Sequence, residues 1–220
     1  MIPLEIRKVV AAYFTNNAAG DLLAKLSIKK SDDKVLDPAC GSGTLLVSSY
    51  KRKLQLSEKI FDESLHQKFI QKELTGIDIM PFSAHLAAVN LALLGLPYKS
   101  DVLRIAIGDS TKRKPGDKIE PAREVLKEAF KSRTLSDYLT TDVVQAKNSK
   151  VHAGTVALHD KGAKPIVLEK ADVVIMNPPF TSCDNLPAEY KIELKKRFTN
   201  PVLTKNVSQE NLVFKHISCS

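Results

Sequence analysis

The sequence predicts an α/β protein with a mostly parallel sheet, and three observations carry this prediction. Short apolar runs of strand length alternate with longer segments whose apolar residues recur at helical spacing. Two glycines, Gly41 and Gly43, directly follow one of the short runs, as in a tight strand-to-helix turn. The chain of 220 residues with 43% hydrophobic content is long enough to bury one α/β core.

The segment before this turn, residues 4–26, predicts two helices separated by a break at 14–17. Polar residues at the break are typical of a helix cap, so the second helix begins there. The apolar residues at helical spacing in the two helices are Ile6, Val9, Val10, Tyr13, Leu22, Leu23 and Leu26.

The stretch from Lys34 to Thr44 predicts a strand, a turn and a helix start. Val35 and Leu36 form a short buried strand, and Asp37 stands at its carboxyl end. The helix that follows the turn carries its apolar face on Thr44, Leu45, Leu46, Val47 and Tyr50. The bare backbone amides of such a helix start can cradle a small polar ligand.

Residues 57–73 predict an additional amphipathic helix before the next strand, 74–79. The apolar side of this helix consists of Ile60, Phe61, Leu65 and Phe69. The strand ends at Asp78, a carboxylate that can accept hydrogen bonds from both hydroxyls of a ribose.

A helix then begins at Pro81 and ends before Gly95 and Pro97, as the positions of these residues in helices predict. Its apolar residues that share a face are Phe82, Leu86, Val89 and Leu93.

A third strand is predicted over 102–107, followed by Asp109 and Ser110. Residues 111–170 form an insertion that is too long for a bare loop. Within it we expect a helix at 119–130 and a hairpin that pairs 151–158 with 165–168.

A last buried strand, 173–176, is followed by Asn177-Pro178-Pro179-Phe180 and then by a lysine-rich helix over 186–198. Ligands of open α/β sheets bind at the carboxyl ends of strands, so this stretch and the glycine turn should meet at one crevice.

Composition limits the class of protein further. The net charge is +8, of which +2 falls in residues 1–110 and +6 in 111–220, and such a basic field suits a polyanion or simply a solvated surface. No apolar run reaches the length of a membrane span, and the amino terminus has no secretory pattern. The three cysteines are too scattered for a disulfide framework or a zinc site, which indicates a cytoplasmic protein.

The two stretches Asp37-Pro38-Ala39-Cys40-Gly41-Ser42-Gly43 and Asn177-Pro178-Pro179-Phe180 together resemble the N6-adenine DNA methyltransferases, and 75–95 resembles the second cofactor motif of type I modification subunits. The resemblance implies a Rossmann-like S-adenosylmethionine-dependent methyltransferase fold that ends before the family's last strands. It implies a helical segment over 1–33 that closes over the cofactor, and a catalytic domain over 34–220 with the insertion at 111–170.

The same resemblance assigns site residues. The residues implied to bind S-adenosylmethionine are Phe14, Thr15, Asp37, Pro38, Ala39, Cys40, Gly41, Ser42, Gly43, Asp78, Ile79, Asp109 and Ser110. Those implied to be catalytic are Asn177, Pro178, Pro179 and Phe180, with no metal. The implied partners are DNA, a specificity subunit and a restriction subunit. At position 16 the family usually has proline, and this chain has asparagine.

The chemistry of an exocyclic amine explains the second motif. The lone pair of such an amine is delocalised into the ring, so catalysis needs acceptors for the amino protons. The Asn177 side-chain oxygen and the Pro178 carbonyl are suitable acceptors, and Phe180 would stack on a base that has left the duplex.

Alternatives remain at this point. An RNA guanine-N2 methyltransferase uses similar motifs, and a protein glutamine methyltransferase shares the second. The chain can also be an inactive cofactor-binding fragment of a longer methylase. Asn rather than Ser before Pro-Pro favours adenine over cytosine in the related enzymes.

Overall fold

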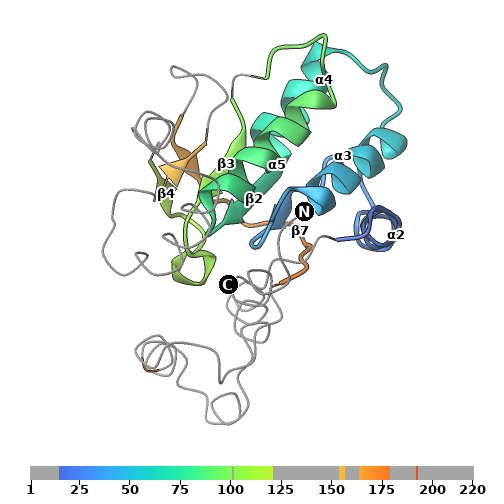
Figure 1. Ribbon diagram of the computed structural model, residues 1–220. Helices are drawn as coiled ribbons and strands as arrows, with labels where there is room; N and C mark the ends of the chain where they lie inside the picture. The colour runs from blue at the N-terminus through green and yellow to red at the C-terminus, as the bar shows by residue number, and fades with distance from the viewer. Residues whose placement is uncertain (1–14, 101, 121–153, 157–163, 179–191, 193–220) are drawn as a thin grey trace. The chain divides into compact units, whose positions relative to one another are not determined.

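The computed structural model describes residues 15–100, 102–120, 154–156, 164–178 and 192. Contacts divide the chain into two units, and one of them, Phe14–Asn177, holds almost all of the described residues. The other consists of Met1–Tyr13 and Pro178–Ser220. The fold below is that of the first unit (Figure 1).

A five-stranded sheet in the order β5-β3-β2-β1-β7 forms the centre of this unit. Its strands are β1 (Val35–Asp37), β2 (Leu74–Asp78), β3 (Arg104–Ile107), β5 (Gly154–Thr155) and β7 (Val173–Val174). All neighbours pair in parallel except β5, which runs antiparallel to β3. The predicted α/β class and mostly parallel sheet are therefore confirmed.

The helical elements connect these strands. They are α2 (Asn17–Ser27), α3 (Thr44–Leu56), α4 (Glu63–Lys68), the π-helix η1 (Phe69–Glu73), α5 (Pro81–Leu93) and the 3₁₀ turn η2 (Ser110–Lys112). Figure 1 shows α2, α3 and α5 as neighbouring helices, and α3 lies between the other two. None of the helices within the described ranges is both long and apolar enough to span a bilayer.

The two faces of the sheet have different covers. The helices bury the larger core on one face, against side chains such as Val35, Leu74 and Ile105. On the other face a small sheet of β4 (Lys118–Ile119) and β6 (Ile166–Val167) covers a second apolar cluster. Alternate residues of a strand point to opposite faces, so neighbours in one strand enter different clusters.

A glycine in β2 sets how close α3 lies to the sheet. A Cβ atom at Gly76 would lie 2.7 Å from Leu46 Cδ1 and 2.8 Å from Ile105 Cδ1, closer than real Cβ contacts. Only a residue without a side chain lets Leu46 of α3 pack directly on the strand. The position of α3 on the sheet, and of the turn that precedes this helix, depends on this close contact.

A buried ion pair joins α3 to the π-helix. Lys53 Nζ lies 3.0 Å from Glu73 Oε2, donates to the Asp33 carbonyl across 2.6 Å, and lies 5.3 Å from the centre of the Phe69 ring. Lys68 pairs with the other Glu73 oxygen at 2.9 Å. Burial lowers the pKa of Lys53, which opposes the raising effect of Glu73.

Two predicted helices are present, but most of the large apolar residues that mark their helical spacing are not the residues that are buried. In α2 the leucines Leu22, Leu23 and Leu26 are exposed, and Gly20 and Ala24 are buried instead. A Cβ at Gly20 would lie 3.0 Å from Ser48 Oγ, so the close contact between α2 and α3 excludes large side chains there.

The same correction applies to α5. Phe82, Val89 and Leu93 are 52%, 40% and 52% exposed. The buried residues of this helix are Pro81, Ala84, Ala87, Ala88 and Leu91. The start at Pro81 and the end before Gly95 are confirmed.

Three further predictions need correction. The helix expected over 57–73 begins only at Glu63, becomes a π-helix at Phe69, and leaves Ile60 outside it and 89% exposed. The hairpin of 151–158 with 165–168 is wrong, because β5 pairs with β3 and β6 pairs with β4.

The third is the helix expected over 119–130. Its first residue, Ile119, lies in β4, and 121–130 lie outside the described residues. Also outside them are the first predicted amino-terminal helix and, apart from Ile192, the helix over 186–198.

Candidate functional site

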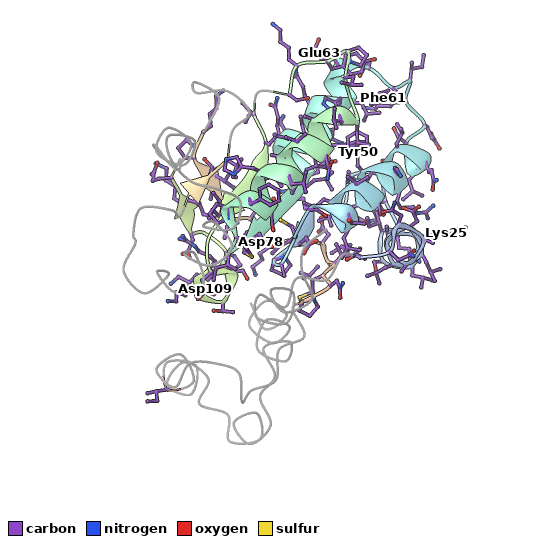
Figure 2. The ribbon with its side chains drawn as sticks, viewed as in Figure 1. Lys25, Tyr50, Phe61, Glu63, Asp78 and Asp109 are labelled. Atoms are coloured by element: carbon purple, nitrogen blue, oxygen red, sulfur yellow. The ribbon has the colours of Figure 1, made fainter. Side chains whose placement is uncertain are left out.

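The polar residues singled out by the sequence lie at one edge of the sheet. Because β3, β2, β1 and β7 are parallel, their carboxyl ends share this edge. Asp37 and Asp78 end their strands, and Asp109 and Asn177 follow theirs after short extensions. Figure 2 shows Asp78 and Asp109 at this common end.

The glycine turn has the predicted backbone. Gly41 and Gly43 have φ of 52° and 83°, a region that favours glycine. A Cβ at Gly43 would lie 2.9 Å from the Cβ of Ala87, so the turn packs tightly on α5. Among the described residues, a Cβ at Gly41 would meet no atom within 4 Å, so this part of the chain leaves space beside the residue.

Neighbouring elements brace the turn through hydrogen bonds. Cys40 N donates to the Ile77 carbonyl at 3.0 Å, and Gly43 N donates to the Cys40 carbonyl at 2.7 Å. Asn90 of α5 donates from Nδ2 to the Ser42 carbonyl at 2.9 Å. Sequence analysis missed Asn90; its one signal is an amide side chain within a mostly apolar helix.

The first turn of α3 directly follows the glycine turn. The residue at its N-cap is Gly43, which has no side chain, and none of the described side chains forms a hydrogen bond that caps the helix. Amide groups at a helix start carry partial positive charge and attract a carboxylate or phosphate.

Asp78 links the ends of β2 and β1. Its Oδ2 accepts a hydrogen bond from Gly41 N at 2.8 Å, and its Oδ1 accepts one from Met80 N at 2.8 Å. Burial raises the pKa of this carboxyl group, although both amides act to lower it. Each oxygen keeps further lone pairs for a ligand.

Asp37 is buried beside Asp78. Its Oδ1 accepts a hydrogen bond from Ala39 N at 3.1 Å, and 1% of the residue is exposed. Burial, together with the nearby charge of Asp78, raises the pKa of Asp37 to about 8. Two carboxyl groups that resist ionisation side by side form a site that a cationic ligand would stabilise.

The remaining residues of the turn pack inward. Pro38 is buried, Ala39 and Ser42 are half-buried, and Cys40 is 5% exposed. Burial raises the pKa of the Cys40 thiol well above its usual value, so this thiol is not a reactive nucleophile.

Beyond β3, Asp109 caps the short helix η2. Its Oδ1 accepts hydrogen bonds from Thr111 N at 3.0 Å and Thr111 Oγ1 at 2.5 Å. Ser110 is the first residue of η2, and Ile79, next to Asp78, is 59% exposed at the same edge.

Asn177 contacts the segment that precedes α2. Its Nδ2 donates a hydrogen bond to Thr15 Oγ1 at 3.0 Å, and both residues are half-buried. The contact joins two stretches 162 residues apart in sequence. Pro178 is half-buried; Phe14, Pro179 and Phe180 lie outside the described residues.

Together these features can hold a ligand with a positive group, a hydroxylated ring and a carboxylate. Asp37 and Asp78 supply two carboxyl groups, which a cationic ligand would help to ionise, and the start of α3 supplies donors. Within the described ranges, no three histidine, cysteine or acidic side chains are grouped in a way that could hold a metal ion.

A mostly parallel sheet with a glycine turn after β1 and an acid at the end of the neighbouring strand β2 indicates a Rossmann-like fold of the methyltransferase class. The chain belongs to the family described as "MmeI, DNA-methyltransferase domain", which matches residues 12–213. The resemblance to DNA methyltransferases seen in the sequence is thereby confirmed.

Three solved structures are similar to this chain. A modification subunit of a putative type I restriction enzyme from Vibrio vulnificus YJ016 is 17% identical, with a TM-score of 0.41, over 84% of this chain and 29% of its own. A possible methylase from Clostridium difficile 630 is 18% identical, with a TM-score of 0.34, over 56% and 40%.

The third is the ATP-dependent type ISP restriction-modification enzyme LlaBIII bound to DNA. It is 18% identical, with a TM-score of 0.47, over 94% of this chain and 14% of its own. The chain thus spans well under half the length of each of these structures. No curated protein matches it.

Proposed function

We propose that the chain transfers a methyl group from S-adenosylmethionine to the exocyclic N6 amine of adenine in DNA, as part of a restriction-modification system. One observation carries the proposal: the pairing of β1 with β7 brings the glycine turn and Asn177 to adjacent strand ends. A donor site and an acceptor site have to be neighbours for a direct transfer.

The described residues fit the donor. S-adenosylmethionine would supply a methyl group that its sulfonium charge already activates. Asp37 would face the positive charge of the ligand, Asp78 its ribose hydroxyls, and Asp109 with Ser110 its adenine amino group. Ile79 adds an apolar surface, and Phe14 and Thr15 belong to the segment expected to close over the ligand.

The catalytic motif would hold the amine that is methylated. The Oδ1 atom of Asn177 and the carbonyl of Pro178 accept the two amino protons, which returns the lone pair to the nitrogen. Proline has no N–H that would compete there. Pro179 shapes the turn, and Phe180 stacks on the flipped base.

The organisation of the protein belongs to the same proposal. It comprises a helical segment over 1–33, a catalytic domain over 34–220 with an insertion at 111–170, a specificity subunit and a restriction subunit as partners, and a cytoplasmic location. The net charge of +8 supports DNA as the substrate.

The test offers labelled S-adenosylmethionine with DNA, RNA and release-factor protein in parallel. We expect label in DNA only, and nucleoside analysis should find N6-methyladenine rather than N4-methylcytosine. DNA that already carries N6-methyladenine at every adenine is the control and should stay unlabelled. Label in RNA alone would favour the guanine-N2 alternative, and calorimetric binding without transfer would favour the fragment.

A single substitution tests the catalytic motif. Asn177→Ala should abolish transfer while the affinity for S-adenosylmethionine changes little, because Asn177 serves the acceptor and not the donor. A variant that retains most of its rate would remove Asn177 from the mechanism.

A further inference from the structure

We propose that Thr15 is a positioning residue, whose hydroxyl group holds the Asn177 side chain with its oxygen free for the target amine. The inference rests on the proposed function and deepens it. It gives Thr15 a role different from the cofactor contact that the sequence predicts.

The first step is the asymmetry of a carboxamide. Asn177 carries a donor group, Nδ2, and an acceptor, Oδ1, on opposite sides of one carbon. Rotation by half a turn exchanges them and would point two N–H donors at an amine that also donates. Only one of the two orientations can accept the amino protons.

The second step is the orientation that the structure shows. Nδ2 of Asn177 donates to Thr15 Oγ1 at 3.0 Å. An amide whose nitrogen is held in this way presents its oxygen on the side away from Thr15. The observed hydrogen bond therefore leaves Oδ1 available to the target amine before any substrate binds; in the rotated amide the same hydroxyl would donate to Oδ1 and occupy it.

The third step is the rigidity of the support. Thr15 precedes Asn16, whose Oδ1 accepts a hydrogen bond from Ala18 N at 2.9 Å and caps α2. Asn16 stands where the family usually has proline. Because Asn16 caps the helix, the backbone next to Thr15 is held in place.

The helix α2 is itself fixed against α3, the helix that begins at the glycine turn. Ser48 Oγ of α3 donates to Asp21 Oδ1 of α2 at 2.6 Å, close to the tight contact at Gly20. The position of Thr15, and through it the orientation of Asn177, is therefore fixed relative to α3, the helix whose start would hold the methyl donor.

Two variants test the proposal by steady-state kinetics with DNA. Thr15→Val keeps the shape of the side chain and removes the hydroxyl. We expect kcat to fall about tenfold, which corresponds to the free energy of one hydrogen bond. Thr15→Ser keeps the hydroxyl and should retain most of the rate. KM for S-adenosylmethionine should stay unchanged in both; a raised KM with unchanged kcat would overturn the proposal in favour of a donor contact.

A second background separates orientation from general damage. In Asn177→Asp the two carboxylate oxygens are equivalent, so there is no amide to orient. Thr15→Val should then cost much less than in the natural chain. An equal loss in both backgrounds would overturn the proposal, because it would show that Thr15 acts by supporting the fold.

A readout without activity completes the test. In nuclear magnetic resonance spectra of the chain alone, the Asn177 side-chain NH₂ protons should exchange slowly with solvent, and Thr15→Val should make them exchange faster. Unchanged exchange in this variant would overturn the proposal. If the natural chain transfers no methyl group to DNA, the proposed function fails, and this measurement decides separately whether Thr15 holds Asn177.

Discussion

The backbone amide of Gly41 donates a hydrogen bond of 2.8 Å to Asp78 Oδ2, so the end of β2 holds the turn that follows β1. The carboxylate that we propose for the ribose therefore also shapes the loop around the rest of the ligand. Asp78→Ala would remove the ribose contact and the support of the loop together, so a variant that separates the two is needed.

Asp78→Asn offers one oxygen where the natural residue offers two, so Gly41 N or Met80 N loses its acceptor. We expect the free energy of unfolding to fall by about 1 kcal/mol in urea titrations. Calorimetry with S-adenosylmethionine and its 2′-deoxy analogue isolates the ribose contact. The natural chain should bind the analogue more weakly, and the variant should discriminate less; equal discrimination would place the ribose elsewhere.

The affinity for S-adenosylmethionine should depend on pH through Asp37. Its pKa is raised to about 8 by burial and by the charge of Asp78, so below pH 8 it holds a proton that a cationic ligand must displace. Affinity should therefore rise from pH 6 to 8, by up to about tenfold per unit, and level off above pH 8. Calorimetry in two buffers of different ionisation enthalpy should detect the released proton.

The matched control for this effect is Asp37→Asn, which cannot ionise. Its affinity should be lower than that of the natural chain at pH 8 and should lack the Asp37 contribution to proton release. A natural chain whose affinity is flat from pH 6 to 8 would contradict the assignment of Asp37 to the positive group.

The two glycines of the turn should respond differently to alanine. Gly43→Ala places a Cβ 2.9 Å from Ala87 at a φ of 83°, so strain and overlap should lower the free energy of unfolding by about 2 to 3 kcal/mol. Gly41→Ala has open space and should cost about 1 kcal/mol.

For ligand binding, the informative variant is Gly41→Ala. The methyl group of Gly41→Ala enters the space proposed for the ligand, so its affinity for S-adenosylmethionine should fall at least tenfold despite the small loss of stability. Thermal unfolding and calorimetry on both variants check this. Gly41→Ala with natural affinity would show that the ligand does not occupy this space.

The buried ion pair of α3 gives a stability prediction. Lys53→Met leaves the Glu73 carboxylate with Lys68 alone, and we expect a loss of about 3 kcal/mol. Adding Glu73→Gln to this variant should restore part of that loss, because no buried charge then lacks its partner. The control Lys51→Met changes an exposed lysine of the same helix and should stay within about 0.5 kcal/mol.

Local sequence patterns predicted the elements around the turn well. Glycine and proline mark the end of β1, the start of α3 and both ends of α5, and both glycines of the turn have positive φ as predicted. These features depend on the residues themselves and their nearest neighbours, so the sequence carries them directly.

The buried faces of α2 and α5 could not be read from the pattern, because close helix packing reverses the usual rule. At Gly20 and at Ala87 the neighbouring helix or turn lies within about one side-chain radius, so small residues go inside and leucines outside. Size, not hydrophobicity, decides which side of these helices is buried.

Pairings between distant segments were equally hidden. The partner of β5 is β3 and not the neighbouring β6, and the bonds of Gly41 with Asp78 and of Asn177 with Thr15 join residues far apart. The sequence predicted which side chains gather at the carboxyl ends of the strands, since these ends lie together in any parallel sheet. It could not predict which of them bond to each other.

The β7 edge of the sheet has a practical consequence. Among the described strands β7 pairs with β1 alone, and its Val174 is 38% exposed. A strand edge that no described strand covers, and that carries an apolar side chain, is a template on which another strand can add. A charged residue in place of Val174 should disfavour such strand addition, and light scattering of concentrated solutions of the two polypeptides would measure the difference.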